Sequence, residues 1–384
     1  MNIPFSRPSI GEEEIAEVVA CLRSGWLTTG PRTAQFEREF GAAVQAPHAL
    51  AVTSATAGLH LTMLALGPRP GDEVITTPLT WPATVNTIVL SGATPMLVDV
   101  EPDTLNLDVR LLEAALSPRT RAIVPVHFAG QPCDMDALTA IAGRFGVRIV
   151  EDAAHALGAE HRGRPIGSVG DAAVFSFHPI KNITTGEGGM ITSRDGALAH
   201  RMRLLRFHGV ERDAWKAYGQ ARLPLYDVIE PGLKYNLTDI QSAIGLHQLR
   251  KLAALNAERA RLARRYDDGC ARIPALRPLG CAAYPHRHAH HLYVVRLALE
   301  ELRVDRNAFM AAVQDAGVGL GLHFTAVHEL TYYRARLGDL CAALPAATDA
   351  SRRIFSLPLF PGLSDAEQDR VLDVLEQTVR RHRR

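Results

Sequence analysis

The chain has 384 residues, of which 47% are hydrophobic and 22% are charged, and its formal net charge at pH 7 is +1. Such a composition is that of a folded globular protein, and the length allows a large domain and a smaller one around a sizeable core. The nearly balanced charge gives no electrostatic basis for binding nucleic acid or an anionic membrane surface.

The N-terminal sequence and the cysteines bear on where the protein works. We expect no signal peptide, because MNIPFSRPSIGEEEIAEVV lacks a basic segment followed by an apolar core. We expect no membrane span either, because no apolar run is long enough. The five cysteines have no CxxC spacing, so neither a zinc site nor a disulfide framework is indicated. A cytoplasmic location is therefore expected.

From residue 49 onward, short β-branched runs alternate with helical patterns. The predicted strands of this region lie in 51–53, 73–77, 96–100, 122–128, 148–152, 172–177 and 189–193. Most are continuous apolar runs separated by helical segments, which predicts an α/β fold with a mostly parallel sheet covered on both faces. In such sheets, ligands bind at the carboxyl ends of the strands.

A long helix is predicted to begin after Thr238, whose side chain can cap TDIQSAIGLHQLRKLAALNAERARLARRY. It leads into a smaller C-terminal α+β unit. That unit has predicted strands in HLYVVRLAL and GLGLHF and predicted helices near 305–316 and 365–382. We therefore predict a large domain over residues 1–250 and a small domain over residues 251–384.

Small residues open a helix directly after the first strand, in TSATAGLH (53–60). The free N–H groups and the positive end of such a helix suit a phosphate. A plain helix cap is the alternative for this stretch alone, since Ser and Thr cap helices in many proteins.

A carboxylate follows a later strand, in VEDAAHALGA (150–159). Asp152 lies where the buried strand emerges, and Ala153 and Ala154 leave room for a flat group. A buried carboxylate is costly unless a cation accompanies it. The alternative here is an Asp that caps a helix.

A lysine lies at the end of a third strand, in FHPIKNITTGEGGMI (177–191). Lys181 has Ser176 and His178 nearby, and a surface lysine in a loop is the alternative for this stretch alone. An amine attacks a carbonyl only when neutral, which burial beside another cation favours. A phosphate site, a carboxylate and a lysine in this order on one sheet are what pyridoxal phosphate (PLP) requires. The lysine forms the Schiff base, and the carboxylate keeps the ring nitrogen protonated.

Two further stretches call for other interpretations. PHRHAHHLY (285–293) contains four histidines, His286, His288, His290 and His291, but no carboxylate or cysteine accompanies them. A loop with a structural role or at the edge of the substrate site is favoured over a metal site, so we predict no metal. GEGG (186–189) is not a dinucleotide fingerprint, because it leads into a strand and not into a helix.

These motifs follow one another along nearly the whole chain, as SGWLTTGP (24–31), TSATAGLH, LTWPATVN (79–86), VEDAAHALGA, SFHPIKNITTGEGGMI, KYNLTDIQ (234–241) and LHF (322–324). In them the sequence resembles the DegT/StrS family of sugar aminotransferases, which have the aspartate aminotransferase fold (fold type I of the PLP enzymes). The resemblance implies a large domain with a mostly parallel seven-stranded sheet and a small C-terminal α+β domain.

The resemblance also implies roles at the matched positions. Lys181 matches the Schiff-base lysine, and Asp152 matches the partner of the ring nitrogen. The other matched cofactor contacts are His155 near the 3-hydroxyl, Trp81 stacked on the pyridine ring, Ala55, Thr56 and Ser176 at the phosphate, and Asn236 from the other subunit of a dimer. His323 and Thr28 match positions that line the sugar site. A structural histidine and a buried core tryptophan are the alternatives for His155 and Trp81.

For function, the resemblance implies a homodimeric aminotransferase with shared active sites that moves an amino group from glutamate to a nucleotide-linked 4-ketosugar. PFSRP, PGLKYNLTDI and SLPLFPG are most similar to the enzymes that form UDP-4-amino-4-deoxy-L-arabinose from a UDP-4-ketopentose, in lipopolysaccharide biosynthesis and lipid A modification. A UDP- or dTDP-linked 4-keto-6-deoxyhexose is the alternative acceptor. The rivals are a sugar 3-dehydratase, whose relatives carry His in place of Lys181, and a non-catalytic regulator of the same fold.

Overall fold

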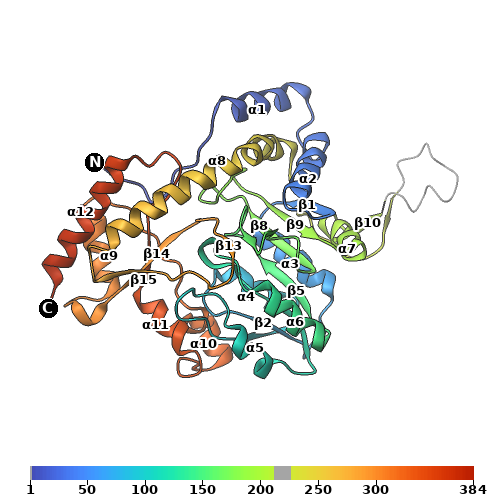
Figure 1. The fold of residues 1–384 in the computed structure, drawn as a ribbon. Coiled ribbons are helices and arrows are strands. Elements are labelled where there is room, and N and C mark those ends of the chain that lie inside the picture. Colours follow the sequence, from blue (N-terminus) through green and yellow to red (C-terminus); the bar gives the residue numbers. More distant parts are fainter. Residues whose placement is uncertain (1, 212–225) are drawn as a thin grey trace.

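A computed structural model describes residues 2–211 and 226–384 (Figure 1). It contains a large seven-stranded sheet and, beside it, a smaller three-stranded sheet with a core of its own. The 32-residue helix α8 (Asp239–Cys270) joins the two parts. Its first half contributes Leu246 and Leu249 to the core of the large sheet, and its second half contributes Leu262 and Tyr266 to the other core.

The predicted mostly parallel seven-stranded sheet is confirmed. Its strands, in spatial order, are β1 (His48–Val52), β9 (Gly189–Ser193), β8 (Ala172–Ser176), β5 (Arg148–Asp152), β4 (Thr120–Val124), β2 (Glu73–Thr76) and β3 (Thr94–Leu97). β9 runs antiparallel to both of its neighbours, β1 and β8, whereas the other neighbouring pairs are parallel. The parallel strands bring their carboxyl ends to one edge.

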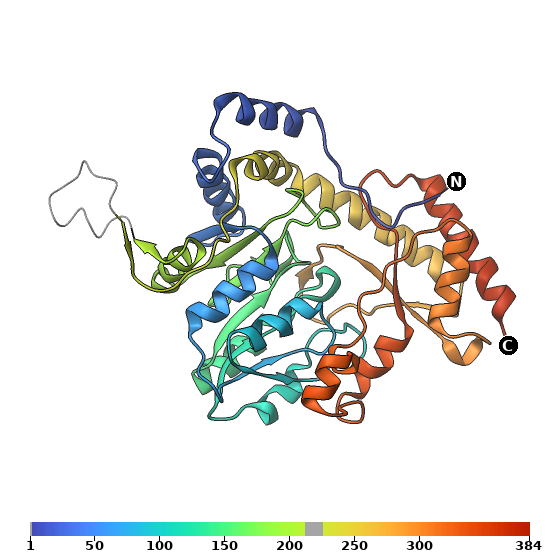
Figure 2. The ribbon, with the colours of Figure 1, turned by 180° about the vertical axis from the view of Figure 1, so that it is seen from behind.

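Helices cover both faces of this sheet, as expected for strands that are apolar on both sides. One face packs against α2 (Pro31–Ala43), α5 (Val109–Ala115), α6 (Met135–Phe145) and the first half of α8. The other packs against α3 (Ala55–Leu66), α4 (Pro82–Leu90) and α7 (Gly196–Arg206). Figure 2 shows α3 and α4 in front of the sheet on this second side.

The starts of these helices follow from local sequence. Thr238 caps α8 as predicted: its hydroxyl accepts a hydrogen bond from the Gln241 N–H at 3.3 Å, and the Gln241 side chain returns to the Thr238 N–H. Ser54 caps α3 by accepting from the Ala57 N–H at 3.0 Å. Pro82 occupies the first position of α4, where its missing N–H costs nothing.

The smaller sheet consists of β12 (Leu276–Pro278), β14 (Tyr293–Leu297) and β15 (Ile354–Leu357), all antiparallel. It shares its core with α9 (Arg306–Asp315) and α12 (Asp365–His382), which are the two helices predicted near 305–316 and 365–382. Ile3 also belongs to this core. The division of the chain at residue 250, within α8, stays a prediction.

The strand predicted in GLGLHF is wrong. Its backbone divides its hydrogen bonds between two partners: the Gly319 N–H donates to Ile3 O at 2.8 Å, and Gly321 pairs with Ser356 in a single bridge. The two glycines permit this close packing. A Cβ on Gly319 would lie 2.6 Å from the Phe5 nitrogen. The alternation of apolar residues in GLGLHF therefore belongs to a segment that packs between the N-terminal residues around Ile3 and the strand that contains Ser356, and not to a strand of its own.

The remaining elements lie around these two parts. They are α1 (Glu12–Ser24), which packs on α8; the pair β10 (Val210–Glu211) and β11 (Asp227–Val228); the small sheet of β13 (His286–Arg287), β6 (Glu160–His161) and β7 (Arg164–Pro165); α10 (Thr331–Leu337) and α11 (Pro345–Arg353); and the short 3-10 helices Phe128–Gly130, Leu299–Glu301 and Val327–Glu329. Within the described ranges, no helix combines the length and the apolar character needed to cross a membrane.

Candidate active site

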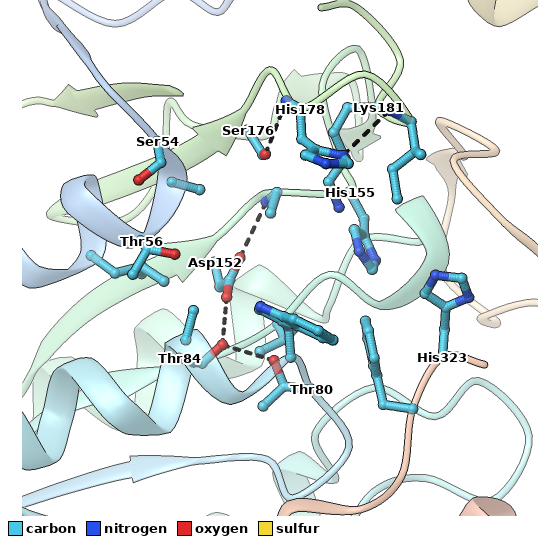
Figure 3. Close-up of a pocket in the computed structure, with 18 of the residues that line it drawn as sticks. Ser54, Thr56, Thr80, Thr84, Asp152, His155, Ser176, His178, Lys181 and His323 are labelled. Carbon is cyan, nitrogen blue, oxygen red and sulfur yellow. Dashed lines mark hydrogen bonds between the residues drawn. The ribbon is translucent and has the colours of Figure 1, made fainter. Parts of the chain in front are cut away.

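A pocket of about 360 Å³ lies at the carboxyl ends of β5 and β8, between the two parts of the molecule (Figure 3). The first turns of α3 and α4 and the segment around His323 complete its wall. Most of the predicted site residues line it: Ala55, Thr56, Trp81, Asp152, His155, Ser176, Lys181 and His323. Residues that are far apart in the sequence therefore meet in one cavity.

Asp152 ends β5 and is 6% exposed. Its Oδ2 accepts a hydrogen bond from the Thr84 hydroxyl at 2.7 Å, and its Oδ1 accepts from the Ala154 N–H at 3.2 Å. Burial raises the pKa of this carboxyl, while the Thr84 hydrogen bond works in the opposite direction. Sequence reasoning missed Thr84, although its place in the first turn of α4, beside Trp81, was a usable signal.

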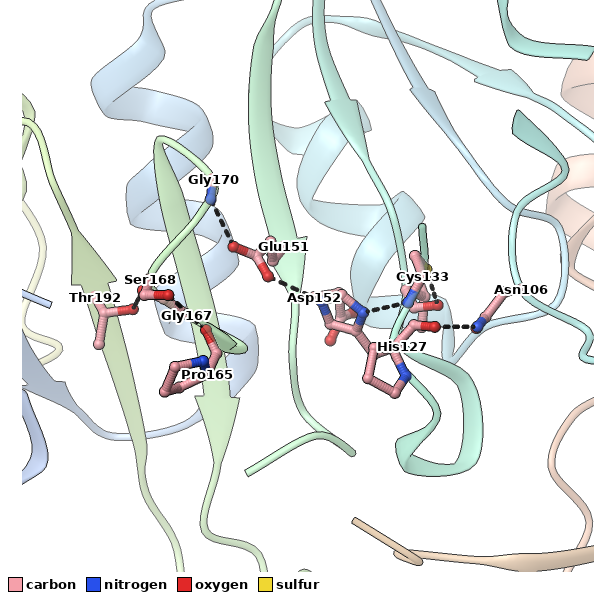
Figure 4. A network of polar contacts seen from close by, with 12 residues as sticks. Asn106, His127, Cys133, Glu151, Asp152, Pro165, Gly167, Ser168, Gly170 and Thr192 are labelled. Carbon is pink, nitrogen blue, oxygen red and sulfur yellow. Dashed lines mark hydrogen bonds and ion pairs between the residues drawn. The ribbon is translucent and has the colours of Figure 1, made fainter. Parts of the chain in front are cut away.

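A buried network fixes the backbone behind Asp152 (Figure 4). His127 Nδ1 accepts from the Cys133 N–H at 3.0 Å, so its Nε2 carries the proton and donates to Glu151 at 3.0 Å. The other Glu151 oxygen accepts from the Gly170 N–H at 2.7 Å. The His127 N–H in turn donates to Asp152 O at 3.2 Å. The end of β5 is therefore held from the side opposite the pocket.

Lys181 faces Asp152 across the pocket from the loop that follows β8. Burial lowers the pKa of its amine to about 8; the Asp152 carboxylate opposes this shift and the Arg259 guanidinium adds to it. The Lys181 Nζ lies 3.4 Å from His291 Nε2. A neutral fraction of the amine is therefore available near neutral pH, as attack on a carbonyl requires.

Histidines surround this amine. The rings of His155 and His291 lie 4.3 Å apart, and His155 also stacks on Phe324. Burial lowers the pKa of both imidazoles well below their usual value. Burial also lowers the pKa of His323 to about 3, and its Nδ1 lies 2.9 Å from the Ser356 hydroxyl. These side chains are therefore neutral hydrogen-bonding groups.

The four neighbouring histidines of the loop before β14 have different surroundings. The ring of His288 stacks on that of His290 at 4.2 Å, His286 belongs to β13, and His291 alone of the four has a hydrogen-bond contact with Lys181. Across the described ranges, no group of three or more His, Cys, Asp or Glu side chains is arranged to hold a metal ion. Sequence reasoning therefore located this loop but missed that one member, His291, contacts the Lys181 amine.

Trp81 occupies the N-cap position of α4. Its side chain is 62% exposed at the pocket, which rules out the alternative of a buried core tryptophan. Its ring lies 6.1 Å from that of Phe324. Ala55 and Thr56 occupy the first turn of α3, whose N–H groups have no partner within a helix. Ser176, the last residue of β8, also lines the pocket, and its hydroxyl accepts a hydrogen bond from the His178 N–H at 3.4 Å.

Two predicted residues, Thr28 and Asn236, do not line the pocket of this chain. Asn236 is 6% exposed; it pairs with Val52 at the edge of the sheet, and its side chain donates to the Thr29 hydroxyl at 2.5 Å. Thr28 is exposed, and its carbonyl accepts from the Asp239 N–H at 3.2 Å. Thr28 therefore belongs to the connection between α1 and α2, and Asn236, shortly before α8, contacts the same connection through Thr29.

The pocket fits PLP by the chemistry of its groups. It offers an amine with a lowered pKa, a carboxyl that a protonated ring nitrogen would stabilise as the carboxylate, and a helix N-terminus for the phosphate. The buried Nδ1 of His155 has no hydrogen-bond partner among the described residues, which leaves it free to meet a polar group of a ligand.

Comparison with known proteins agrees with this chemistry. Residues 8–376 match the model of the DegT/DnrJ/EryC1/StrS aminotransferase family. Spr1654 of Streptococcus pneumoniae, described as a sugar aminotransferase, is 36% identical in its PMP form, with a TM-score of 0.92 over 99% of this chain and 100% of that one. Its PLP form is 35% identical, with a TM-score of 0.90 over 99% of each chain.

Two further structures extend the comparison. The aminotransferase TlmJ of Streptoalloteichus hindustanus is 33% identical, with a TM-score of 0.90 over 99% of each chain. Helicobacter pylori PseC, an aminotransferase of pseudoaminic acid biosynthesis, is 28% identical, with a TM-score of 0.91 over 99% of this chain and 100% of that one. The chain thus belongs to the DegT/DnrJ/EryC1/StrS family and is a PLP-dependent sugar aminotransferase.

Proposed function

We propose that this aminotransferase transfers an amino group from glutamate to a UDP-linked 4-ketopentose and so forms UDP-4-amino-4-deoxy-L-arabinose. The observation that supports amino transfer is the buried Lys181 amine opposite Asp152 in one pocket. The choice of sugar depends on the resemblance in PFSRP, SGWLTTGP, LTWPATVN and PGLKYNLTDI. The cytoplasmic location and a product used in lipid A modification stay predictions from the sequence.

In this proposal, bound PLP supplies an aldehyde that accepts an amine and a ring that takes up an electron pair. Lys181 Nζ would hold the cofactor, and as a free amine it would serve as the base that moves the proton from the donor's α-carbon to the cofactor. The Asp152 carboxylate holds the proton on the ring nitrogen, and the Thr84 hydroxyl fixes that carboxylate at 2.7 Å. In the second half of the reaction, the same amine would move a proton in the reverse direction, from the cofactor to the former ketone carbon of the sugar.

The other pocket residues bind and orient. The first-turn N–H groups of Ala55 and Thr56, with the Ser176 hydroxyl, would hold the phosphate, and Trp81 would cover one face of the ring. His155 would meet the 3-hydroxyl with a neutral ring nitrogen. His323 would face the sugar; because it is neutral, it can donate or accept a hydrogen bond without adding a charge.

We also propose that each complete site includes residues from both subunits of a homodimer. Asn236 and Thr28 support this proposal because they lie together outside the pocket of their own chain. In a dimer, Asn236 of one subunit would contact the phosphate in the other subunit, and Thr28 would reach the sugar there.

Mixing two inactive variants tests the shared site. Lys181→Ala lacks the amine, and Asn236→Asp turns a carboxylate toward the phosphate, which repels it. Random exchange of subunits makes half of the dimers mixed, each with one complete site, so about a quarter of wild-type activity should return. The measurement is amination rate after refolding the mixture, with each unmixed variant as control. Mixed dimers that form but stay inactive would contradict the shared site.

The acceptor is tested by comparing kcat/KM for the UDP-4-ketopentose and for UDP- and dTDP-4-keto-6-deoxyhexoses, with glutamate as donor. We expect a preference of about tenfold or more for the pentose, since rejecting one extra carbon by shape yields about 1–3 kcal/mol. Mass spectrometry of the products identifies which sugar has gained the amine. A preference for a hexose would overturn the choice of sugar and leave the aminotransferase assignment in place.

A further inference from the structure

Arg259, in the middle of α8, is a buried cation directly behind Lys181. It is 2% exposed. Its Nη1 donates to His291 O at 3.2 Å and to Leu359 O at 2.9 Å, and its Nη2 donates to Lys181 O at 3.5 Å. No carboxylate forms an ion pair with it in the part of the chain that the structure describes, and its Nε has no partner there. Among the described residues, no neighbouring carboxylate therefore neutralises the positive charge of Arg259.

Burying a charge in this way is costly, because only carbonyl dipoles replace the lost water. Burial lowers the pKa of the guanidinium to about 10, so it remains charged at neutral pH. A neutral side chain could hydrogen-bond to the same segments at a lower desolvation cost. The presence of a positive charge next to the reactive Lys181 amine therefore indicates that the charge itself has a role.

Arg259 donates hydrogen bonds to three backbone carbonyls, and these show which segments it positions. One belongs to Lys181 itself, one belongs to His291, and the third joins both to the segment before α12. The His291 ring reaches the Lys181 Nζ at 3.4 Å, and its buried Nδ1 has no partner among the described residues. Arg259 thus fixes the backbone on both sides of the contact between the amine and the imidazole.

The titratable groups around Lys181 come from several elements: Asp152 at the end of β5, His155 in the loop after it, His291 before β14, His323, Arg259 on α8, and His178 and Glu187 in the loops beside the pocket. Of the charged neighbours, Asp152 favours the ammonium form of Lys181 and Arg259 disfavours it. The neutral His291 ring can accept a hydrogen bond from the ammonium.

We propose that Arg259 is a positioning residue for the amino-transfer reaction: it holds the Lys181 and His291 segments together and keeps a fixed positive charge behind the Lys181 amine. The proposal rests on Lys181 being the reactive amine. A purely structural Arg259 would contribute to stability and leave the proton affinity of Lys181 unchanged. The two roles therefore differ in a measurable quantity that needs neither cofactor nor substrate.

The test is competitive labelling of the apoprotein with acetic anhydride between pH 6 and pH 11, followed by peptide mass spectrometry. It compares Lys181 with the partly exposed Lys251, also on α8, in each sample. In the wild type, Lys181 should titrate near 8. Arg259→Gln removes the charge and should raise this pKa by about one unit, whereas Arg259→Lys keeps the charge and should leave it close to the wild-type value.

Two further variants complete the design. Arg261→Gln, two residues along α8, removes an exposed cation that pairs with Glu258 and Asp365, and it should not change the titration of Lys181. His291→Leu removes the acceptor and should lower the pKa of Lys181, while His291→Gln should restore it in part. These variants test the His291 contact even where Arg259→Gln does not fold.

A wild-type Lys181 that titrates at its ordinary value of 10.5 would overturn the proposal without any variant. So would a folded Arg259→Gln apoprotein in which the titration of Lys181 is unchanged. Borohydride mapping of the holoenzyme tests the role of Lys181 separately. Failure of the proposed function can thus be told apart from failure of this inference.

Discussion

Lys181→Ala should lower kcat/KM for transamination by at least about a thousandfold, because one amine both attaches the cofactor and transfers the proton. Lys181→Arg is the matched control, since it keeps a positive charge at this position but cannot attack a carbonyl. We expect it to be as inactive as the alanine variant. The measurement is steady-state amination of the ketosugar with glutamate, on variants whose thermal unfolding shows that they are folded.

The same residue can be identified chemically. Borohydride treatment of the PLP-loaded wild type, followed by peptide mapping, should place the cofactor on the peptide that contains Lys181. Two other lysines serve as internal references: Lys234, which contacts Asn236, and Lys251, which pairs with the acidic residues of α1. A label on either of them, or activity of Lys181→Ala within tenfold of the wild type, would refute the assignment.

Asp152→Asn should change activity and stability in opposite directions. It keeps the shape of the side chain but removes the charge that holds the proton on the ring nitrogen, so kcat/KM should fall about a thousandfold. In the apoprotein, burial raises the pKa of Asp152, so the carboxylate form costs stability as the pH rises through that pKa. The neutral amide avoids this cost, and the Tm of the apoprotein at neutral pH should rise.

Thr84→Val provides the comparison for Asp152→Asn. It removes the hydrogen bond at 2.7 Å and leaves the carboxylate, so we expect a smaller loss of activity, of about tenfold. The measurements are kcat/KM of the loaded enzymes and thermal unfolding of the apoproteins. If Asp152→Asn keeps wild-type activity, Asp152 is not the partner of the ring nitrogen; if its apoprotein is less stable, the charge is compensated in the apo fold.

Much of the fold could be predicted from the sequence because the relevant signals are local. Buried parallel strands are continuous apolar runs, and the Thr238 cap marks the start of α8 to the residue. GLGLHF is a segment for which the local pattern gave a wrong prediction. Its pattern is that of a strand, but its hydrogen-bond partners, Ile3 and Ser356, lie far away in the sequence and divide the segment between them.

The site could be predicted where chemistry and a strand end coincide, as for Asp152 and Lys181. His291 and Arg259 could not be found in this way. Arg259 lies in NAERARLARRY among arginines that carry no local mark of burial, and only the packing of α8 makes this one buried while Arg261 is exposed. His291 is one of four similar histidines, and the backbone of its loop determines which one meets the amine.

The position of β9 between β1 and β8 affects how the chain folds during synthesis on the ribosome. β1 ends at Val52, whereas its neighbour in the sheet begins at Gly189. At ribosomal rates of about 5–20 residues per second, Gly189 is added about 7–27 seconds after Val52. During this interval the unpaired edge of β1 is open to strands of other nascent chains. We therefore expect chaperone protection to matter most before Gly189 emerges, because β1 has no neighbour in the sheet until then.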